Sequence, residues 1–202
     1  MIASSAPQLI LASASPRRRQ LLWQLGVPHQ AVAADIDERR LPGEVAVQCV
    51  QRLARQKAER VRASADGAAG LPVLGADTEV LLDDELLGKP ADREHALQML
   101  AQLSGRTHRV VTAVTLIGAQ GALTQLCESE VRFRDLSADE CARYWESGEP
   151  RGKAGGYAIQ GFGAAFIAEL RGSYSSVMGL PLFEVAHLLR QAGLPIWQPG
   201  AA

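Results

Sequence analysis

The stretch from Val73 to Pro90 places a carboxylate at the end of an apolar run. It reads V-L-G-A-D-T-E-V-L-L-D-D-E-L-L-G-K-P, and the short apolar run predicts a buried strand that reaches Asp77. A carboxylate is costly to bury unless it has a partner, a metal ion or a chemical task. A polar turn at 83–85 predicts a hairpin that returns Lys89 toward Asp77. From this stretch alone, a turn aspartate and a surface lysine are an equally good interpretation.

A second polar group surrounds a predicted helix N-terminus. Residues 13–19 read S-A-S-P-R-R-R and follow a short apolar strand. Arginines in the first turn of a helix are unfavourable against the helix dipole. They make sense around an anion, because backbone N–H groups, the Ser13 hydroxyl and the guanidinium groups of Arg17 and Arg18 all donate to phosphate oxygens. The cluster therefore favours a phosphate site over an ordinary capped helix with solvated arginines.

Two further sets of charges precede the Val73–Pro90 stretch. A long helix is expected from about Glu44 to Ser64, and Lys57 falls within its apolar arc, where it must either snorkel or reach a buried anion. Residues 35–40 read D-I-D-E-R-R after a predicted strand. Asp37 or Glu38 could offer oxygen ligands to a hard cation, although a solvated acidic loop is the commoner meaning of such a run.

A glycine-rich segment from Arg151 to Gly163 carries one polar residue between apolar and glycine neighbours. Five glycines in R-G-K-A-G-G-Y-A-I-Q-G-F-G indicate special backbone angles or close approach to a bound group. The Gln160 carboxamide both donates and accepts hydrogen bonds, so it could read the edge of a ring. A purely structural loop has equal weight at this point.

The elements that must position these residues form a mixed α/β chain with long antiparallel ribbons. His95 and His108 lack partner spacing and are interpreted as surface residues. We expect loops at 66–70 and 198–202. The predicted strands cover 8–12, 29–34, 107–117, 123–133 and 166–170 besides the opening stretch, and the predicted helices cover 16–25, 44–64, 92–103, 138–147 and 182–191.

Composition excludes several classes of protein. The chain has 202 residues, 47% hydrophobic and 21% charged, which is ordinary for a globular protein. Its formal net charge of -1 predicts no bulk attraction to nucleic acid or membranes. The three cysteines have no metal-ligand spacing, and we expect neither a signal peptide nor a membrane span. A cytoplasmic protein is the resulting expectation.

Sorted by chemistry, the polar residues describe a nucleotide phosphohydrolase. Phosphoryl transfer needs mainly positioning and charge neutralisation. A carboxylate can hold a metal ion, orient the attacking water or accept its proton. The basic groups that suit phosphates are those of Arg17, Arg18, Lys57 and Lys89. The carboxylates that suit a magnesium-like cation are those of Asp77 with Asp37 or Glu38. The polar groups that suit recognition of a ring are those of Gln160 and Thr78.

Five motifs in order resemble those of the Maf family of nucleoside triphosphate pyrophosphatases. They are L-I-L-A-S-A-S-P-R-R-R, L-G-A-D-T, G-K-P, L-S-G-R-T-H and K-A-G-G-Y-A-I-Q-G, in register from about Leu9 to Gly193. The resemblance implies one Maf-like domain over 1–202, with an elongated sheet flanked by helices in two lobes around a central cleft, as in ITPase-like folds. It also implies a homodimer, a divalent cation (Mg or Mn), cleavage of a nucleoside triphosphate to monophosphate and pyrophosphate, housecleaning of non-standard nucleotides and a link to arrest of cell division.

The resemblance assigns roles by position. Asp77 matches the proton acceptor, with Lys57 and Lys89 as catalytic lysines and Glu38 with Asp77 as metal ligands. Ser13, Arg17 and Arg18 match phosphate-binding positions, and Arg17, Thr78 and Gln160 match positions tied to base selectivity. The I-Q-G sequence resembles the branch that acts on dTTP and UTP.

Two alternatives and two departures accompany this assignment. The alternatives are a pyrophosphatase for a modified purine nucleotide and a nucleotide-sensing regulator of division without turnover. Gly152 stands where many members have aspartate, and Glu79 where an apolar residue is commoner. We expect Glu79 to point to the opposite face of the strand from Asp77.

Overall fold

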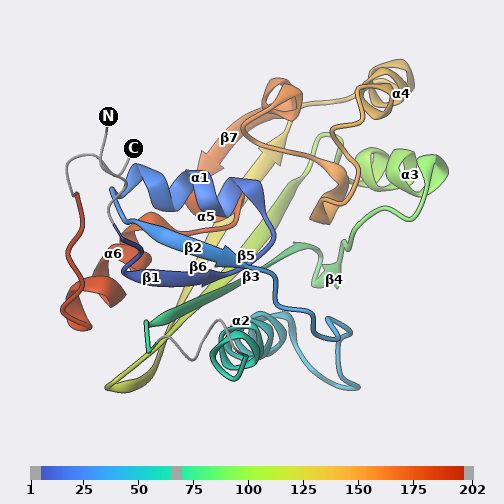
Figure 1. Ribbon diagram of the computed structural model, residues 1–202. Helices are drawn as coiled ribbons and strands as arrows, with labels where there is room; N and C mark the ends of the chain where they lie inside the picture. The colour runs from blue at the N-terminus through green and yellow to red at the C-terminus, as the bar shows by residue number, and fades with distance from the viewer. Residues whose placement is uncertain (1–5, 65–69, 198–202) are drawn as a thin grey trace. The chain divides into compact units, whose positions relative to one another are not determined.

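A computed structural model describes residues 6–64 and 70–197 (Figure 1). The expected loop residues 66–69 and the expected tail 198–202 lie outside this range. The chain divides into two compact units. The first comprises the described residues of Met1–Asp77, Thr112–Cys127 and Gly179–Ala202, and the second comprises Thr78–Val111 and Glu128–Met178.

The strands form one seven-stranded sheet of order β2-β1-β3-β5-β6-β7, with β4 paired to β3. Strand β1 is parallel to both β2 and β3, whereas β4 is antiparallel to β3 and β7 is antiparallel to β6. Strands β5 and β6 are also neighbours and are joined by the short turn at 119–120, which makes them antiparallel, so the predicted mixed, largely antiparallel α/β sheet is confirmed. The strands are β1 Leu9–Ala12, β2 His29–Val32, β3 Val73–Leu82, β4 Glu85–Leu86, β5 Thr107–Gly118, β6 Gly121–Phe133 and β7 Ile167–Arg171.

In the first unit, two connections between parallel strands run in opposite directions along the sheet. Helix α1 (Pro16–Gln24) leads from β1 to β2, and helix α2 (Ala46–Arg62) leads from β2 to β3 on the other side of β1. Right-handed crossovers in opposite directions put their helices on opposite faces of a sheet, and Figure 1 shows α1 and α2 on the two faces. Open α/β sheets bind ligands beyond the carboxyl ends of the strands where the strand order reverses. In this unit that place lies just after Ala12 and its register partner Gly75.

Local sequence accounts for the helices of this unit. Ser15 caps α1 by accepting a hydrogen bond from the backbone N–H of Arg18, Pro16 occupies the first turn, and Gly26 ends the helix with a positive φ of 62°. Helix α6 (Leu182–Gln191) has the predicted bounds. Within residues 6–64 and 70–197, no helix is both long and apolar enough to cross a lipid bilayer.

The backbone of β3 lies directly against α2. A Cβ atom built on Gly75 would lie 2.1 Å from the Ala54 carbonyl oxygen and 2.9 Å from the Ala58 nitrogen. Only a glycine permits this approach. Val50 and Lys57 are further buried residues of α2.

The second unit contains helices α3 (Arg93–Leu103), α4 (Ala138–Glu146) and α5 (Tyr174–Met178), and 3-10 turns at Ala154–Gly156 and Phe162–Phe166. The prediction that His108 lies at the surface is wrong. Its side chain is 2% exposed, Nε2 lies 2.8 Å from the Tyr157 hydroxyl, and the ring packs edge-on against Phe133. Burial lowers the pKa of His108 to about 4.

Candidate active site

A buried lysine joins two carboxylates in the first unit. Lys57 Nζ donates to Asp77 Oδ1 at 2.7 Å and lies 2.6 Å from Glu38 Oε1. Lys57 and Asp77 are each 7% exposed, whereas the Glu38 side chain is 44% exposed. Of the two alternatives for Lys57, the structure therefore gives the buried anion and not snorkelling. Three charged residues far apart in the sequence meet at one point.

The strand and helix that carry this pair fix its geometry. Asp77 lies two residues beyond Gly75, where β3 contacts α2 most closely. Lys57 lies next to Ala58 on the buried face of α2. The short distance between the β3 and α2 backbones thus brings the ammonium within hydrogen-bonding distance of the carboxylate.

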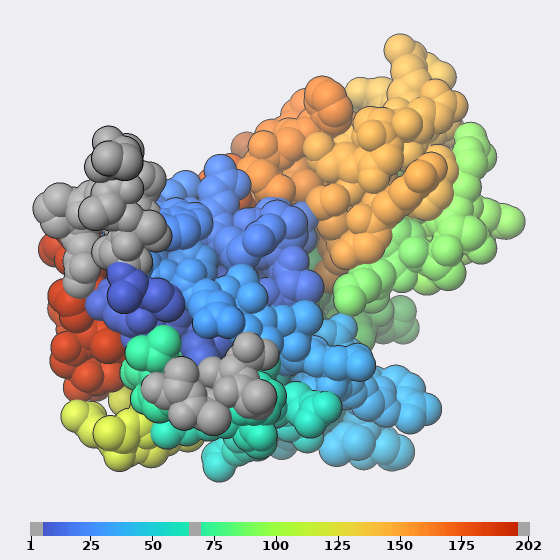
Figure 2. All heavy atoms as spheres, viewed as in Figure 1, coloured from blue at the N-terminus to red at the C-terminus, as the bar shows by residue number. Residues whose placement is uncertain are grey.

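In the acidic loop after β2, Asp37 and Glu38 have different partners. Asp37 forms a bidentate ion pair with Arg39 on the exposed surface, and the hydrogen bonds from Arg39 lower the pKa of the Asp37 carboxyl to about 2. The neighbouring Glu38 instead reaches Lys57. The loop lies on the surface of the first unit, coloured light blue in Figure 2. Of the two acids considered from the sequence, Glu38 is the one that joins Asp77.

The segment after β1 surrounds the guanidinium of Arg18. Arg18 Nη1 donates to the Ala76 carbonyl at 2.8 Å and lies 3.5 Å from Ser13 Oγ, and Nε donates to the Gly179 carbonyl at 2.7 Å. Burial lowers the pKa of Arg18, the charges of Asp77 and Glu38 oppose that shift, and the charge of Arg17 adds to it. An arginine remains charged at any ordinary pH. Arg18 therefore ties the end of β1 to β3 and supplies fixed positive charge near Asp77.

The first turn of α1 concentrates positive potential. It has no acidic residue to balance the helix dipole and carries Arg17 and Arg18. Ser13 is 7% exposed, and its hydroxyl accepts a hydrogen bond from the Ser15 N–H at 3.2 Å. A helix N-terminus with nearby guanidinium groups attracts anions. Ser13, Arg18, Lys57, Asp77 and Glu38 are thus brought together within one unit.

Three of the predicted residues, Thr78, Lys89 and Gln160, belong to the second unit. Lys89 and Gln160 are exposed, and Thr78 is half-buried. The Gly155 N–H lies 2.9 Å from the Leu87 carbonyl and 3.1 Å from the Gly88 carbonyl, so the backbone before Lys89 pairs with the glycine-rich segment. This pairing explains part of the glycine density, because a Cβ on Gly155 would also lie 3.0 Å from Val80 Cγ1.

The expectation for Glu79 is wrong. Residues two apart in a strand share one face, and β3 runs unbroken from Val73 to Leu82. Glu79 therefore points to the same side as Asp77, and it is 7% exposed.

Some contributors carry no sequence signal. The carbonyls of Ala76 and Gly179 hold Arg18, and nothing in the sequence marks these two because every residue has a backbone carbonyl. Glu149 and Tyr144 hold the backbone around Gln160, a role that the sequence does not predict. Glu149 follows a predicted helix by a few residues, and only the fold reveals where its carboxylate points.

Fold and site together define a class: an α/β protein that gathers carboxylates, a lysine and a basic helix N-terminus beyond the carboxyl ends of parallel strands. The family model described as "Maf-like protein" matches residues 8–192. The chain belongs to the Maf family.

Several relatives share about half of their residues with this chain over nearly their whole length. One from Methylococcus capsulatus is 51% identical over 93% of this chain and 92% of the relative. One from Hahella chejuensis is 47% identical over 94% of each, and one from Bordetella parapertussis is 50% identical over 96% of this chain and 97% of the relative. All three are named dTTP/UTP pyrophosphatase. The solved Staphylococcus aureus Ham1 protein aligns with a TM-score of 0.38 and 14% identity over 64% of this chain and 72% of that protein.

Proposed function

We propose that this protein hydrolyses dTTP and UTP to the monophosphate and pyrophosphate. The observation that carries the proposal is the Asp77–Lys57–Glu38 group beside the α1 N-terminus, at distances of 2.7 and 2.6 Å from the shared ammonium. The names of relatives at about half identity support the same substrates. A cytoplasmic location and a homodimer remain predictions, as does the single-domain assignment.

In this proposal the phosphates bind at the first turn of α1. Ser13 and Arg17 donate to phosphate oxygens, and Arg18 adds charge from a fixed position. Lys57 and Lys89 balance the charge that develops on the leaving pyrophosphate. Little covalent chemistry is asked of the protein, because phosphoryl transfer depends on positioning and charge.

Asp77 is proposed as the proton acceptor. A water molecule attacks phosphorus, its proton passes to the Asp77 carboxylate, and the P–O bond between the α and β phosphates breaks. Lys57 keeps Asp77 in one orientation through the 2.7 Å hydrogen bond. The burial of both groups strengthens the electrostatic interaction relative to water.

The donor set suits a hard divalent cation. Asp77 and Glu38 each offer a carboxylate oxygen, at 2.7 and 2.6 Å from Lys57 Nζ. Across the residues that the structure describes, no cluster of three or more His, Cys, Asp or Glu side chains could hold a metal ion alone. Mg²⁺ usually takes one or two carboxylates and completes its shell with waters and substrate phosphates, so the two residues fit. When bound, the cation would neutralise phosphate charge.

Base selection is assigned to Gln160, with Thr78 and Arg17. The Gln160 carboxamide is exposed and can donate and accept at once. The pyrimidine edge of uracil or thymine presents the same alternation. A site that hydrogen-bonds such an edge discriminates strongly against bases that leave its polar groups unpaired.

The test is a pyrophosphate-release screen with Mg²⁺ or Mn²⁺ across standard and modified triphosphates. We expect the highest kcat/KM with dTTP and UTP, and an Asp77→Asn variant that binds nucleotide without turnover. Preference for a modified purine would favour the first alternative. Binding without turnover by the unaltered protein would favour a nucleotide sensor, and orthophosphate as the only product would exclude the proposed reaction.

A further inference from the structure

The Gln160 segment is a tight turn that follows two buried residues. The Gly161 N–H bonds to the Ala158 carbonyl at 3.2 Å, which closes a four-residue turn. Ala158 and Ile159 are buried, whereas Gln160 is exposed. The turn therefore presents the Gln160 side chain directly after two buried residues.

Two side chains from the α4 region hold this turn on both sides. Before it, the Ala158 N–H donates to the Tyr144 hydroxyl at 3.0 Å. After it, the Phe162 N–H donates to Glu149 Oε2 at 2.9 Å and the Gly163 N–H donates to Glu149 Oε1 at 3.0 Å. Tyr144 also donates to Glu149 Oε1 at 2.7 Å, so the two side chains form one connected network.

The protonation states suit this network. Burial raises the pKa of Tyr144, and its hydrogen bond to Glu149 raises it further. Burial also favours a higher pKa for Glu149, but hydrogen bonds from Tyr144, Gly163 and Phe162 outweigh it and leave the pKa below its usual value. A protonated phenol thus donates to an ionised carboxylate, which is a charge-assisted hydrogen bond.

The glycines beside Gln160 are required by these two side chains. A Cβ on Gly161 would lie 2.0 Å from Glu149 Oε2. A Cβ on Gly163 would lie 2.8 Å from the Tyr144 hydroxyl and 2.8 Å from the Ala158 carbonyl. The G-F-G spacing after Gln160 therefore reflects the approach of Glu149 and Tyr144 to the backbone.

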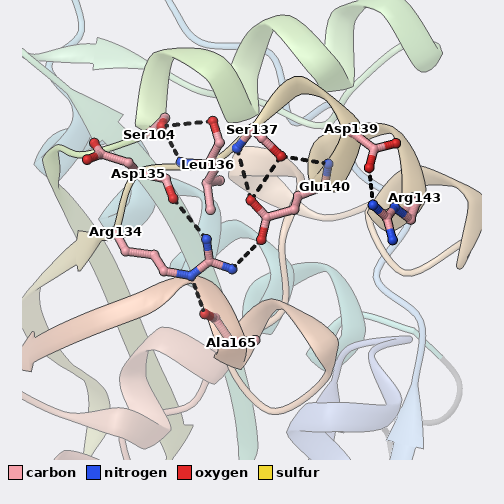
Figure 3. Close-up of polar contacts among 9 residues, drawn as sticks. All are labelled: Ser104, Arg134, Asp135, Leu136, Ser137, Asp139, Glu140, Arg143 and Ala165. Carbon is pink, nitrogen blue, oxygen red and sulfur yellow. Dashed lines mark hydrogen bonds and ion pairs between the residues drawn. The ribbon is translucent and has the colours of Figure 1, made fainter.

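The helix that carries Tyr144 is itself anchored within the same unit (Figure 3). Arg134 bonds to Glu140 at 2.6 Å and to the Ala165 carbonyl at 3.0 Å. Ser137 and Glu140 form a capping box at the N-terminus of α4. This anchor holds the first turn of α4, whereas Tyr144 lies near the end of the helix and Glu149 lies beyond it.

We propose that Glu149 and Tyr144 are positioning residues that set base selectivity by fixing the turn that presents Gln160. The proposal rests on the proposed function, in which Gln160 contacts the base. A carboxylate that accepts two consecutive backbone N–H groups fixes the direction of the chain, and a turn displaced by about 1 Å misplaces the hydrogen bonds to a base edge. Neither residue touches the reacting atoms in this proposal.

The test is a double-mutant cycle read as the ratio of kcat/KM for UTP over CTP. In Glu149→Gln an amide N–H₂ replaces one acceptor, so the variant loses a bond to Phe162 or Gly163. We expect that ratio to fall about fivefold to tenfold, the scale of one hydrogen bond, mainly through KM for UTP. In a Gln160→Ala background Glu149→Gln should change the ratio no further, because both act through one contact. Tyr144→Phe is the second variant. It should lower the ratio to a similar extent and should have no further effect in the Gln160→Ala background.

The matched control is Glu140→Gln, which weakens the Arg134 anchor on the same helix. It should lower thermal stability and leave the UTP to CTP ratio unchanged. Additive effects of Glu149→Gln and Gln160→Ala, or a ratio that falls equally in Glu140→Gln, would overturn the inference while leaving the proposed function intact. If Gln160→Ala left the selectivity unchanged, both the proposed contact between Gln160 and the base and the inference about Glu149 and Tyr144 would be wrong. If the protein turns over no nucleotide, the same cycle is read from dissociation constants for UTP and CTP.

Discussion

Lys57 is the residue on which the Asp77 geometry depends. Its ammonium is the buried counter-charge of Asp77 and also reaches Glu38. Removing one partner of a buried ion pair leaves an uncompensated charge, which typically costs about 3 kcal/mol or more. We therefore expect Lys57→Met to lower the free energy of unfolding at pH 7 by about 3 kcal/mol, as measured by urea denaturation.

An exposed ion pair on the same helix supplies the control for this prediction. Arg55 and Glu59 form an i,i+4 pair with side chains 60% and 48% exposed. Such pairs contribute about 0.5 kcal/mol, so Arg55→Met should hardly change stability. Adding Asp77→Asn to Lys57→Met should recover much of the loss. Equal losses in Lys57→Met and Arg55→Met would show that the buried pair contributes no special stability.

The buried His108 should make the free energy of unfolding depend on pH. Its pKa is about 4 in the folded protein, against 6.5 for an ordinary histidine. Between these values the unfolded chain binds a proton that the folded protein does not, so stability is fully present above pH 6.5 and is lost as the pH falls toward 4. The shift corresponds to about 3 kcal/mol.

Urea denaturation at several pH values measures this loss. In His108→Gln the stability should fall less steeply between pH 6.5 and 4, since glutamine keeps a polar group near Tyr157 but does not titrate. His187→Gln, at an exposed position of α6, should keep the slope of the unaltered protein. A slope unchanged in His108→Gln would assign the pH dependence to other groups.

At the scale of elements, the contact between β3 and α2 determines where Asp77 lies. A methyl group on Gly75 would meet backbone atoms of α2 at 2.1 and 2.9 Å, and neither can rotate away. Overpacking of this kind costs about 1–3 kcal/mol. Gly75→Ala should therefore lower both stability and turnover, measured by denaturation and by pyrophosphate release.

Gly118→Ala is the matched change on a neighbouring strand of the same unit. Its nearest contact would be Pro72 at 3.9 Å, an ordinary packing distance. We expect it to fold and turn over normally. If Gly75→Ala does the same, the strand and helix are not held as closely as these distances indicate.

Elements defined by local rules could be predicted from the sequence, whereas those defined by distant partners could not. Ser15, Pro16 and Gly26 mark both ends of α1, and the structure confirms them. The pairing of β1 with β3 joins segments about sixty residues apart and has no local signal. The surface prediction for His108 is wrong for a related reason. Which face of a strand becomes buried depends on what packs against it.

At the scale of the whole molecule, the sequence indicated the chemistry of the candidate site but not its connections. The sequence predicts Asp77, Lys57 and Glu38 as separate candidate residues. Only the crossover of α2 from β2 to β3 brings their side chains into contact. The different roles of Asp37 and Glu38 depend on Arg39, which forms an ion pair with Asp37, whereas Glu38 contacts Lys57. The Glu149 network could not be predicted, because it is a set of contacts to backbone N–H groups.

Nucleotide binding should raise the stability of the whole chain. A ligand that binds only the folded state at a hundred times its Kd stabilises that state by about 2.7 kcal/mol. For a protein of 202 residues this corresponds to a rise in Tm of about 5–10 °C. Asp77→Asn is the form to use, because it should keep the nucleotide intact during the measurement.

Differential scanning calorimetry of Asp77→Asn with UTP, dTTP or CTP, each with Mg²⁺, gives the comparison. We expect UTP and dTTP to raise Tm more than CTP at equal concentration. In the proposed site the Gln160 carboxamide is held with its N–H₂ toward O4 and its oxygen toward N3–H of the base, and cytosine presents the reverse pattern of donor and acceptor. Gln160→Ala in the same background should reduce the difference between UTP and CTP and keep the part of the shift that comes from the phosphates. Equal shifts for all three nucleotides in Asp77→Asn would mean that the phosphates alone provide the binding energy, and Gln160 would lose its assigned role.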